Sequence, residues 1–340
     1  MAFELTVKKK VISLSMILAF LTITYVLGIA FSPENVQNRK AGEPVFSILN
    51  KESVARIEII EGDLPTELEK RGEDWVVMIS SMAFPALESR VDSLLDLVIA
   101  LKKSQVVSAN PENWQNFEVS GKNSKQLKLF DKTGQVIAHL HIGKSGLGSK
   151  GNYIRLESSN EVIQSDRSLD FYLNSEASFW SDLHLFARNL TGEDIIRITI
   201  RSRISFSEHE ENLNGLDYTL VLENVSGVET WQVHGMDSSL YPLSPEKVDS
   251  VANTLAAFEG NEFIVDLAQD QAGLAAPVAE IEFTTIDDAS YTLQVGTHLK
   301  EENQYYIKVA GQPYGYMAAA WRLEKILVPL ETLVNIEQAN

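Results

Sequence analysis

Short runs of alternating apolar and polar residues recur along most of the chain and predict β-strands. In the first half the runs are residues 55–60, 74–79, 126–130, 135–142 and 152–156. In the second half they are residues 195–200, 218–222, 279–284, 291–295 and 305–309, with a further strand at Trp231. Apolar residues at helical spacing predict amphipathic helices over residues 87–101 and 248–258, the second preceded by a Ser244-Pro245 helix start. Shorter segments, residues 168–173 and 321–327, close the two halves.

The same order of elements therefore occurs twice, and several sequence motifs recur with it. The offset between recurring motifs stays between 153 and 157 residues, which is the size of a domain and too long for a solenoid repeat. The matching pairs are Trp75-Val76-Val77 with Trp231-Gln232-Val233, Phe84-Pro85 with Tyr241-Pro242, Arg90-Val91-Asp92-Ser93 with Lys247-Val248-Asp249-Ser250, Leu140-His141-Ile142-Gly143 with Leu293-Gln294-Val295-Gly296, and Tyr153-Ile154-Arg155 with Tyr306-Ile307-Lys308.

This pattern predicts an α+β protein with two tandem repeated domains, each a mainly antiparallel sheet with one long amphipathic helix and a short closing helix. We place the first repeat at residues 45–188 and the second at residues 189–335, followed by a tail of residues 336–340. Within each repeat the expected order is β-β-(α)-β-β-β-(α). A hairpin turn at residues 131–134 joins two strands of the first repeat.

An uncharged run of 21 residues, 11–31, precedes the repeats and has the length of a transmembrane helix. Lys8, Lys9 and Lys10 come directly before it, so residues 1–10 are expected in the cytoplasm and everything after the span outside it. Residues 32–44 are polar and form a linker. A cleaved signal peptide is the alternative, because Gly28-Ile29-Ala30 has small residues at both cleavage-type positions.

Charge and cysteine content narrow the possible functions. The net charge is −18, and the first 40 residues carry five basic against two acidic side chains, so the other 300 residues hold −21. An acidic body of this kind disfavours nucleic-acid binding. The chain has no cysteine, which excludes disulfides, thiol catalysis and a lipidated-cysteine anchor.

The repeated residues have structural explanations. Trp75 and Trp231 each lie inside an alternating strand, where a core position is expected. Gly143 and Gly296 each end a strand and are expected to fill a turn that needs positive φ.

The candidates for chemistry are few, and none of them is repeated. Residues 138–145, AHLHIGKS, formally resemble a phosphate-binding loop, but the four intervening residues form a strand and no helix follows, so no nucleotide site is expected. His139 and His141 share one strand face and could bind a metal if a third ligand came from elsewhere, although surface histidines are the expectation. The cluster Glu208, His209, Glu210 and Glu211 matches no calcium loop. No hydrolase signature is present, and the sequence predicts no catalytic residue, cofactor site or metal site.

The chain resembles the bacterial DUF4340 family, a domain of unknown function. The resemblance covers roughly residues 45–330 and rests on the N-terminal anchor, the Trp75 strand and the helix from Arg90. It also rests on six short motifs: Ile142-Gly143, Tyr153-Ile154-Arg155-Leu156, Ser178-Phe179-Trp180-Ser181-Asp182, Gly273-Leu274, Val295-Gly296 and Tyr305-Tyr306-Ile307-Lys308. It implies an envelope protein akin to the extracytoplasmic parts of gliding-motility ABC-transporter auxiliary proteins. The family has no established catalytic residues, so none are carried over.

Two functions are open at this point. The first is a non-enzymatic accessory protein, anchored in the bacterial inner membrane, that binds an ABC transporter permease or another envelope protein. The second is an envelope protein that binds or hydrolyses glycans or peptides at a site between the two repeats, with Trp180, Trp231 and Trp321 as lining residues.

Overall fold

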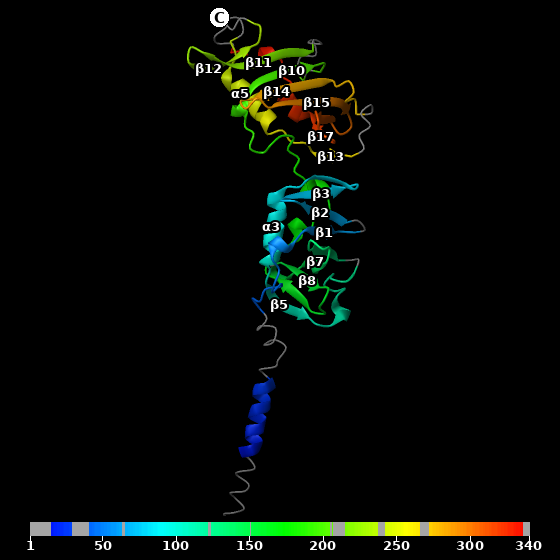
Figure 1. The fold of residues 1–340 in the computed structure, drawn as a ribbon. Helices are drawn as coiled ribbons and strands as arrows, with labels where there is room; N and C mark the ends of the chain where they lie inside the picture. The colour runs from blue at the N-terminus through cyan, green and yellow to red at the C-terminus, as the bar shows by residue number, and fades with distance from the viewer. Residues whose placement is uncertain are drawn as a thin grey trace, which may run out of the picture. The chain divides into compact units, whose positions relative to one another are not determined.

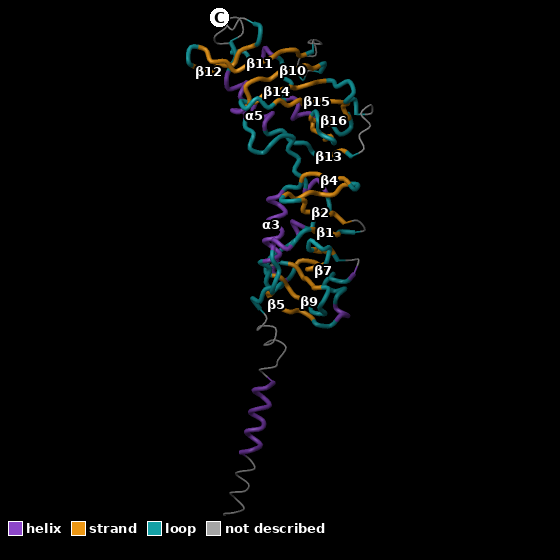
Figure 2. The backbone as a smooth tube through the Cα atoms, in the orientation of Figure 1, coloured by secondary structure: helices purple, strands orange, loops and turns teal. Residues whose placement is uncertain are grey.

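The chain folds into two compact units, each built around an antiparallel sheet. The computed structural model describes residues 15–28, 41–62, 65–121, 124–149, 151–204, 206, 215–236, 242–265 and 272–335. The first unit takes in the chain up to Met78 and Ala86–Trp180, and the second takes in Ile79–Pro85 and the chain from Ser181 onward. Strands predominate over helices in both (Figure 2). The expected α+β class with mainly antiparallel sheets is confirmed.

The first sheet has nine strands in the order β4-β3-β2-β1-β6-β7-β8-β9-β5. Its strands are β1 (Arg56–Ile60), β2 (Pro65–Arg71), β3 (Asp74–Ile79), β4 (Met82–Pro85), β5 (Lys103–Ser108), β6 (Lys125–Phe130), β7 (Val136–Ser145), β8 (Asn152–Leu156) and β9 (Val162–Ser165). The predicted hairpin joins β6 to β7: Asp131 accepts hydrogen bonds from the backbone N–H groups of Thr133 and Gln135, and Gly134 has φ 82°. Local turn chemistry therefore sets the register of this strand pair.

Helix α3 (Glu88–Ile99) supplies the apolar face that the sequence predicts. Its buried residues are Val91, Leu94, Leu95 and Val98, which recur at helical spacing. The helix lies beside the first sheet (Figure 1). A second, shorter helix, α4 (Ala177–Trp180), ends the first unit.

The second sheet has eight strands in the order β12-β11-β10-β14-β15-β16-β17-β13. Its strands are β10 (Ile195–Ser202), β11 (Leu216–Val225), β12 (Val228–Val233), β13 (Glu262–Ile264), β14 (Ala279–Thr285), β15 (Ser290–Leu299), β16 (Gln304–Val309) and β17 (Gly315–Ala319). Its helices are α5 (Pro245–Ala256), α6 (Ala320–Glu324) and α7 (Leu330–Leu333). Ser244 and Pro245 start α5 as predicted, but the Ser244 side chain makes no capping hydrogen bond.

Six strands were not among the expected ones, so the predicted order within each repeat is incomplete. They are β2, β4, β5, β9, β13 and β17. All six have seven residues or fewer. In β2, for example, the apolar alternation is weak: it reads PTELEKR and buries only Thr66 and Leu68. Pairing with neighbouring strands, which the local pattern does not encode, makes these segments extended.

Gly143 and Gly296 have a different role from the one expected. Neither ends a strand nor has positive φ, because they lie inside β7 and β15. A Cβ atom at Gly143 would collide with the carbonyl oxygen of Phe117, and one at Gly296 with that of Ala272. In both units a covering segment crosses the strand so closely that only a glycine fits.

The predicted membrane span, residues 11–31, is described only in part. Residues 15–28 form a helix, and the rest of the span lies outside the described residues. Within the described part of the chain, no helix is both long enough and apolar enough to cross a membrane. The acidic segment 208–211, residues 1–10, most of the linker and the tail of residues 336–340 also lie outside the described residues.

Candidate functional site

The tryptophans divide into buried residues and one exposed residue. Trp75 and Trp231 are each 5% exposed, which confirms the expected core role. Trp180 is fully buried, and its indole N–H donates to the backbone oxygen of Asn174 at 2.8 Å. Trp180 and Trp231 therefore present no ring to a ligand, so the expectation that they line a binding cleft is wrong. Trp321 is 49% exposed.

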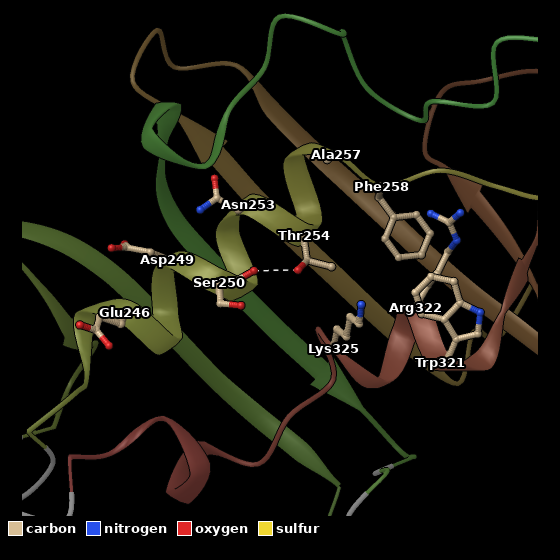
Figure 3. Close-up of a pocket in the computed structure, with 10 residues that line it drawn as sticks. All are labelled: Glu246, Asp249, Ser250, Asn253, Thr254, Ala257, Phe258, Trp321, Arg322 and Lys325. Atoms are coloured by element: carbon tan, nitrogen blue, oxygen red, sulfur yellow. Dashed lines mark hydrogen bonds between the residues drawn. The ribbon is translucent and has the colours of Figure 1, made fainter.

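Trp321 lines a hollow of about 600 Å³ in the second unit. Figure 3 shows α5 forming one wall and the α6 segment forming the other. The hollow has the volume of a typical ligand or peptide site. Its lining residues are Glu246, Asp249, Ser250, Asn253, Thr254, Ala257, Phe258, Trp321, Arg322 and Lys325.

Positive charge gathers around the exposed ring. The Arg322 guanidinium carbon lies 4.9 Å from the Trp321 ring centroid, and the Lys325 ammonium nitrogen lies 4.7 Å from it. Arg322 also pairs with Glu259 at 3.5 Å. Its Nε atom is buried and has no hydrogen-bond partner among the described residues. Trp321, Arg322 and Lys325 thus form a cationic and aromatic corner on the surface of an otherwise acidic chain.

The α5 wall of the hollow is polar, and part of it is held in place by hydrogen bonds. The Trp231 indole N–H donates to the Asp249 carboxylate at 3.0 Å, which fixes that side chain against the core. The Asn253 side-chain oxygen accepts the backbone N–H of Gly192 at 3.2 Å. Glu246, Asp249 and Ser250 are exposed. The hollow therefore has an acidic side on α5 and a basic side at α6.

A second polar cluster lies on the first sheet and includes the two histidines singled out in the sequence. The expectation that both lie on the surface is wrong, because His141 is 4% exposed and His139 is only partly exposed. Loop residues preceding β6 lie against this face: Trp114 covers Arg155, whose guanidinium carbon is 4.0 Å from the ring centroid. Burial lowers the pKa of both His139 and His141.

Glu157 joins this cluster and was not identified in the sequence. It follows β8, and its backbone N–H donates to the backbone oxygen of His139. Its carboxylate lies 2.6 Å from His141 Nε2, and this hydrogen-bonding contact lowers the pKa of Glu157. The pairing of β7 with β8 places Glu157 here, and no local motif encodes that pairing.

The segment that resembles a phosphate-binding loop is part of a strand. Residues 138–145 lie on β7, so their backbone groups are directed into the sheet ladder. The helix that such a loop requires does not follow, since the next element is the short 3₁₀ turn Leu147–Ser149.

A further ionic cluster lies in the second unit around Asp182. Arg188 Nε donates to one Asp182 oxygen at 2.7 Å, and His184 Nδ1 lies 2.8 Å from the other. His184 Nε2 lies 3.0 Å from Glu259. Burial alone would raise the pKa of Asp182, but the hydrogen bonds from Arg188 and His184 outweigh it and hold this pKa below its usual range.

Comparison with protein-family models gives one match, which covers residues 75–277 with the domain of unknown function DUF4340. The chain belongs to the DUF4340 family. None of the curated proteins and none of the solved structures compared with the chain matches it.

The region that matches DUF4340 contains the whole histidine cluster but only part of the hollow. It contains His139, His141 and Glu157, and it contains the α5 wall of the hollow. It ends before Trp321 and Lys325, so the basic corner of the hollow lies beyond the region that defines the family.

Proposed function

We propose that this DUF4340 protein is a non-enzymatic interaction protein whose second unit docks an extended segment of a partner protein in the hollow between α5 and α6. It would be anchored in the bacterial inner membrane by residues 11–31, with residues 1–10 cytoplasmic and both units outside the cytoplasm. The partner would be an ABC transporter permease or another envelope protein. The resemblance to gliding-motility auxiliary proteins stays a prediction.

The observation that carries the docking proposal is the exposed Trp321 with Arg322 and Lys325 beside it. Tryptophan and arginine are the residue types that most often dominate binding energy at protein interfaces. A half-exposed indole between two cations offers a partner both apolar surface and positive charge. A partner segment with an acidic side chain would pair with the cations and cover the ring.

The apolar helix at the start of the chain supports the membrane anchor. Met16, Leu18 and Phe20 are more than 60% exposed, and their neighbours on residues 15–28 are exposed as well. A contiguous apolar surface of this kind is stable in a lipid or protein environment and unfavourable in water. The lysines before the span set the orientation.

We propose further that the two units arose by duplication, with residues 45–188 and 189–335 as the two repeats. The strand order supports this, because β3-β2-β1-β6-β7-β8-β9-β5 and β12-β11-β10-β14-β15-β16-β17-β13 follow the same sequence of elements. Two local irregularities recur with it. Register shifts interrupt β7–β8 after Ile142 and β15–β16 after Val295, each next to the glycine that a covering segment crosses.

Site-specific photocrosslinking tests the docking proposal. A benzoylphenylalanine replaces Ser250 on the α5 wall of the hollow in the full-length chain, expressed in its native membranes. The expected result is a crosslinked product of defined mass, whose yield falls at least tenfold when Trp321→Ala and Lys325→Glu are added.

The matched control carries the same crosslinker at Ile286, an exposed apolar position of the second unit that does not line the hollow. It is expected to give no such product. Recovery of the monomer alone from both positions, or equal yields with and without the Trp321 and Lys325 substitutions, contradicts the proposal. A crosslinked glycan or free peptide in place of a protein would support the alternative, an envelope ligand-binding or hydrolytic protein.

A further inference from the structure

The cluster on the first sheet joins three donors of the kind that bind transition metals. One ring nitrogen from each of His139 and His141 and one carboxylate oxygen of Glu157 lie within 4.8 Å of one another. The two imidazole rings are tilted against each other, with centroids 4.7 Å apart. The proposed docking function of the second unit does not use any of them.

A hydrogen bond on the far side of His141 positions its ring. Ser124 Oγ lies 2.8 Å from the backbone oxygen of Gly121 and 2.9 Å from His141 Nδ1. When the hydroxyl donates to Gly121 it accepts from Nδ1–H, and in that tautomer Nε2 presents its lone pair toward Glu157.

Nε2 of His141 lies 2.6 Å from Oε2 of Glu157. An imidazole nitrogen and a carboxylate oxygen are both ligand atoms for a divalent metal ion, and here they already lie side by side.

Arg155 lies beside this contact. Its NH2 atom reaches the same Glu157 oxygen at 3.4 Å, while its Nε and NH1 atoms donate to the backbone oxygens of Val119 and Leu156. The guanidinium is further held over Trp114. It therefore orients the Glu157 carboxylate from one side and does not enter the short contact with His141.

The second histidine completes a set of three metal-binding side chains. A ring nitrogen of His139 lies within 4.8 Å of the ligand atoms of His141 and Glu157, and His139 Nε2 is 2.9 Å from the side-chain oxygen of Gln126. Two imidazoles and a carboxylate are a ligand set that zinc takes in proteins. The remaining ring nitrogen of such a histidine donates to an outer oxygen acceptor, the place that Ser124 Oγ takes beside His141.

We propose that His139, His141 and Glu157 bind one divalent transition-metal ion, with Ser124 as the residue that orients His141. The site is accessible from one side, because the Glu157 side chain is 57% exposed. In the second unit, Gln294 lies at the position in the β14-β15-β16 ladder that His141 takes in β6-β7-β8, so the site is confined to the first unit.

Calorimetric titration with zinc chloride alone tests the proposal on the full-length, untagged chain in detergent, after removal of metals with a chelator. The expected result is one zinc ion per chain with a dissociation constant of micromolar or below. Glu157→Gln is expected to weaken binding at least a hundredfold, and His141→Gln to abolish it. Glu157 is exposed enough for its variant to keep the fold, which circular dichroism would verify.

His298→Gln is the matched control, since His298 lies outside the cluster and pairs with Asn303. It is expected to bind zinc as the unsubstituted chain does. Cobalt in place of zinc gives a second readout through its visible absorption bands, expected in the unsubstituted chain and absent from Glu157→Gln. An unsubstituted chain that binds no metal, or equal zinc affinity in Glu157→Gln and His298→Gln, overturns the proposal and leaves a hydrogen bond between His141 and Glu157.

Discussion

The two sheets carry different chemistry at the same place in the same strand order. On the first sheet, His141 of β7 lies opposite Arg155 of β8, and a covering segment buries both. On the second, Gln294 of β15 lies opposite Lys308 of β16, and neither is buried. Meanwhile the second unit places its cationic and aromatic corner at the surface, beside α5. The strand orders of the two sheets correspond, whereas their polar groups differ in kind and in exposure. Separate functions of the two units would arise from these polar groups.

The largest loss of stability is expected when one of the two equivalent core tryptophans, Trp75 and Trp231, is removed. Trp75→Ala and Trp231→Ala each remove a side chain that is 5% exposed. Each is expected to lower the free energy of unfolding by about 4 kcal/mol, because a large buried ring leaves a cavity. Hydrogen exchange followed by mass spectrometry would localise the loss. Protection should fall in the unit that carries the substitution, and equal loss in both units would mean that they do not unfold separately.

The second-largest loss of stability is expected at Gly143 and Gly296, the two glycines beneath the covering segments. Gly143→Ala and Gly296→Ala are each expected to cost about 3 kcal/mol, because the new methyl group meets backbone that cannot rotate away. Gly227→Ala is the control: it has open space and φ 90°, so only the left-handed backbone is penalised, by about 1 kcal/mol. Chemical denaturation would measure all three. A loss of stability in Gly143→Ala with none in Gly296→Ala would contradict an equivalent role for the two glycines.

The ion pairs of Asp182 with Arg188 and His184 are expected to give a pH-dependent contribution to stability. Its pKa is lowered in the folded protein, so its ionised form adds stability above the unfolded-state pKa, and this stability is lost as pH falls through the folded-state value. Asp182→Asn is expected to cost about 1 to 2 kcal/mol at pH 7, and the cost is expected to shrink as the pH is lowered below about 4. Urea unfolding over this pH range measures the cost, and a cost that does not change with pH would contradict the prediction. Exposed Glu73→Gln is the control, with no expected change.

Ser124→Ala tests the orientation of His141. It removes the hydrogen-bond partner of Nδ1 while leaving His139, His141 and Glu157 in place. Zinc affinity is expected to fall about tenfold, as for other outer partners of metal-bound histidines. Titration of Ser145→Ala, a serine of the same strand as His141 but outside the cluster, provides the comparison. An unchanged affinity in Ser124→Ala would remove Ser124 from the site.

The smallest effect on stability is expected at the exposed corner of the second unit. Trp321→Ala should change the free energy of unfolding by less than about 1 kcal/mol, because half of the ring is already in solvent. The same substitution is expected to abolish partner crosslinking. A stability loss as large as that of Trp231→Ala would show that Trp321 belongs to the core.

What the sequence predicted well is what neighbouring residues determine. The α3 face, the Pro245 start of α5 and the turn at Asp131 each rest on residues a few positions apart, and each was found in place. Chain segments far apart determine the rest. The role of Gly143 depends on Phe117, which lies 26 positions earlier in the chain.

The polar sites depend on distant residues in the same way. His139 and His141 were recognisable as a pair on one strand face, but Glu157 reaches them only through the β7–β8 register. Trp321 was proposed from the sequence as a lining residue of a binding site, together with Trp180 and Trp231. No local sequence pattern distinguishes the exposed Trp321 from the other two, which are buried. Tertiary packing decides which of the tryptophans remains available to a partner.

Anomalous diffraction at the zinc edge tests most directly whether chemistry on the shared framework is confined to one unit. Crystals of the full-length chain grown with zinc are expected to give a peak about 2 Å from His141 Nε2 and from a Glu157 oxygen, and no peak at Gln294. A direct hydrogen bond between His141 and Glu157 with no peak between them would contradict the account, as would an equal peak at the corresponding place on the second sheet.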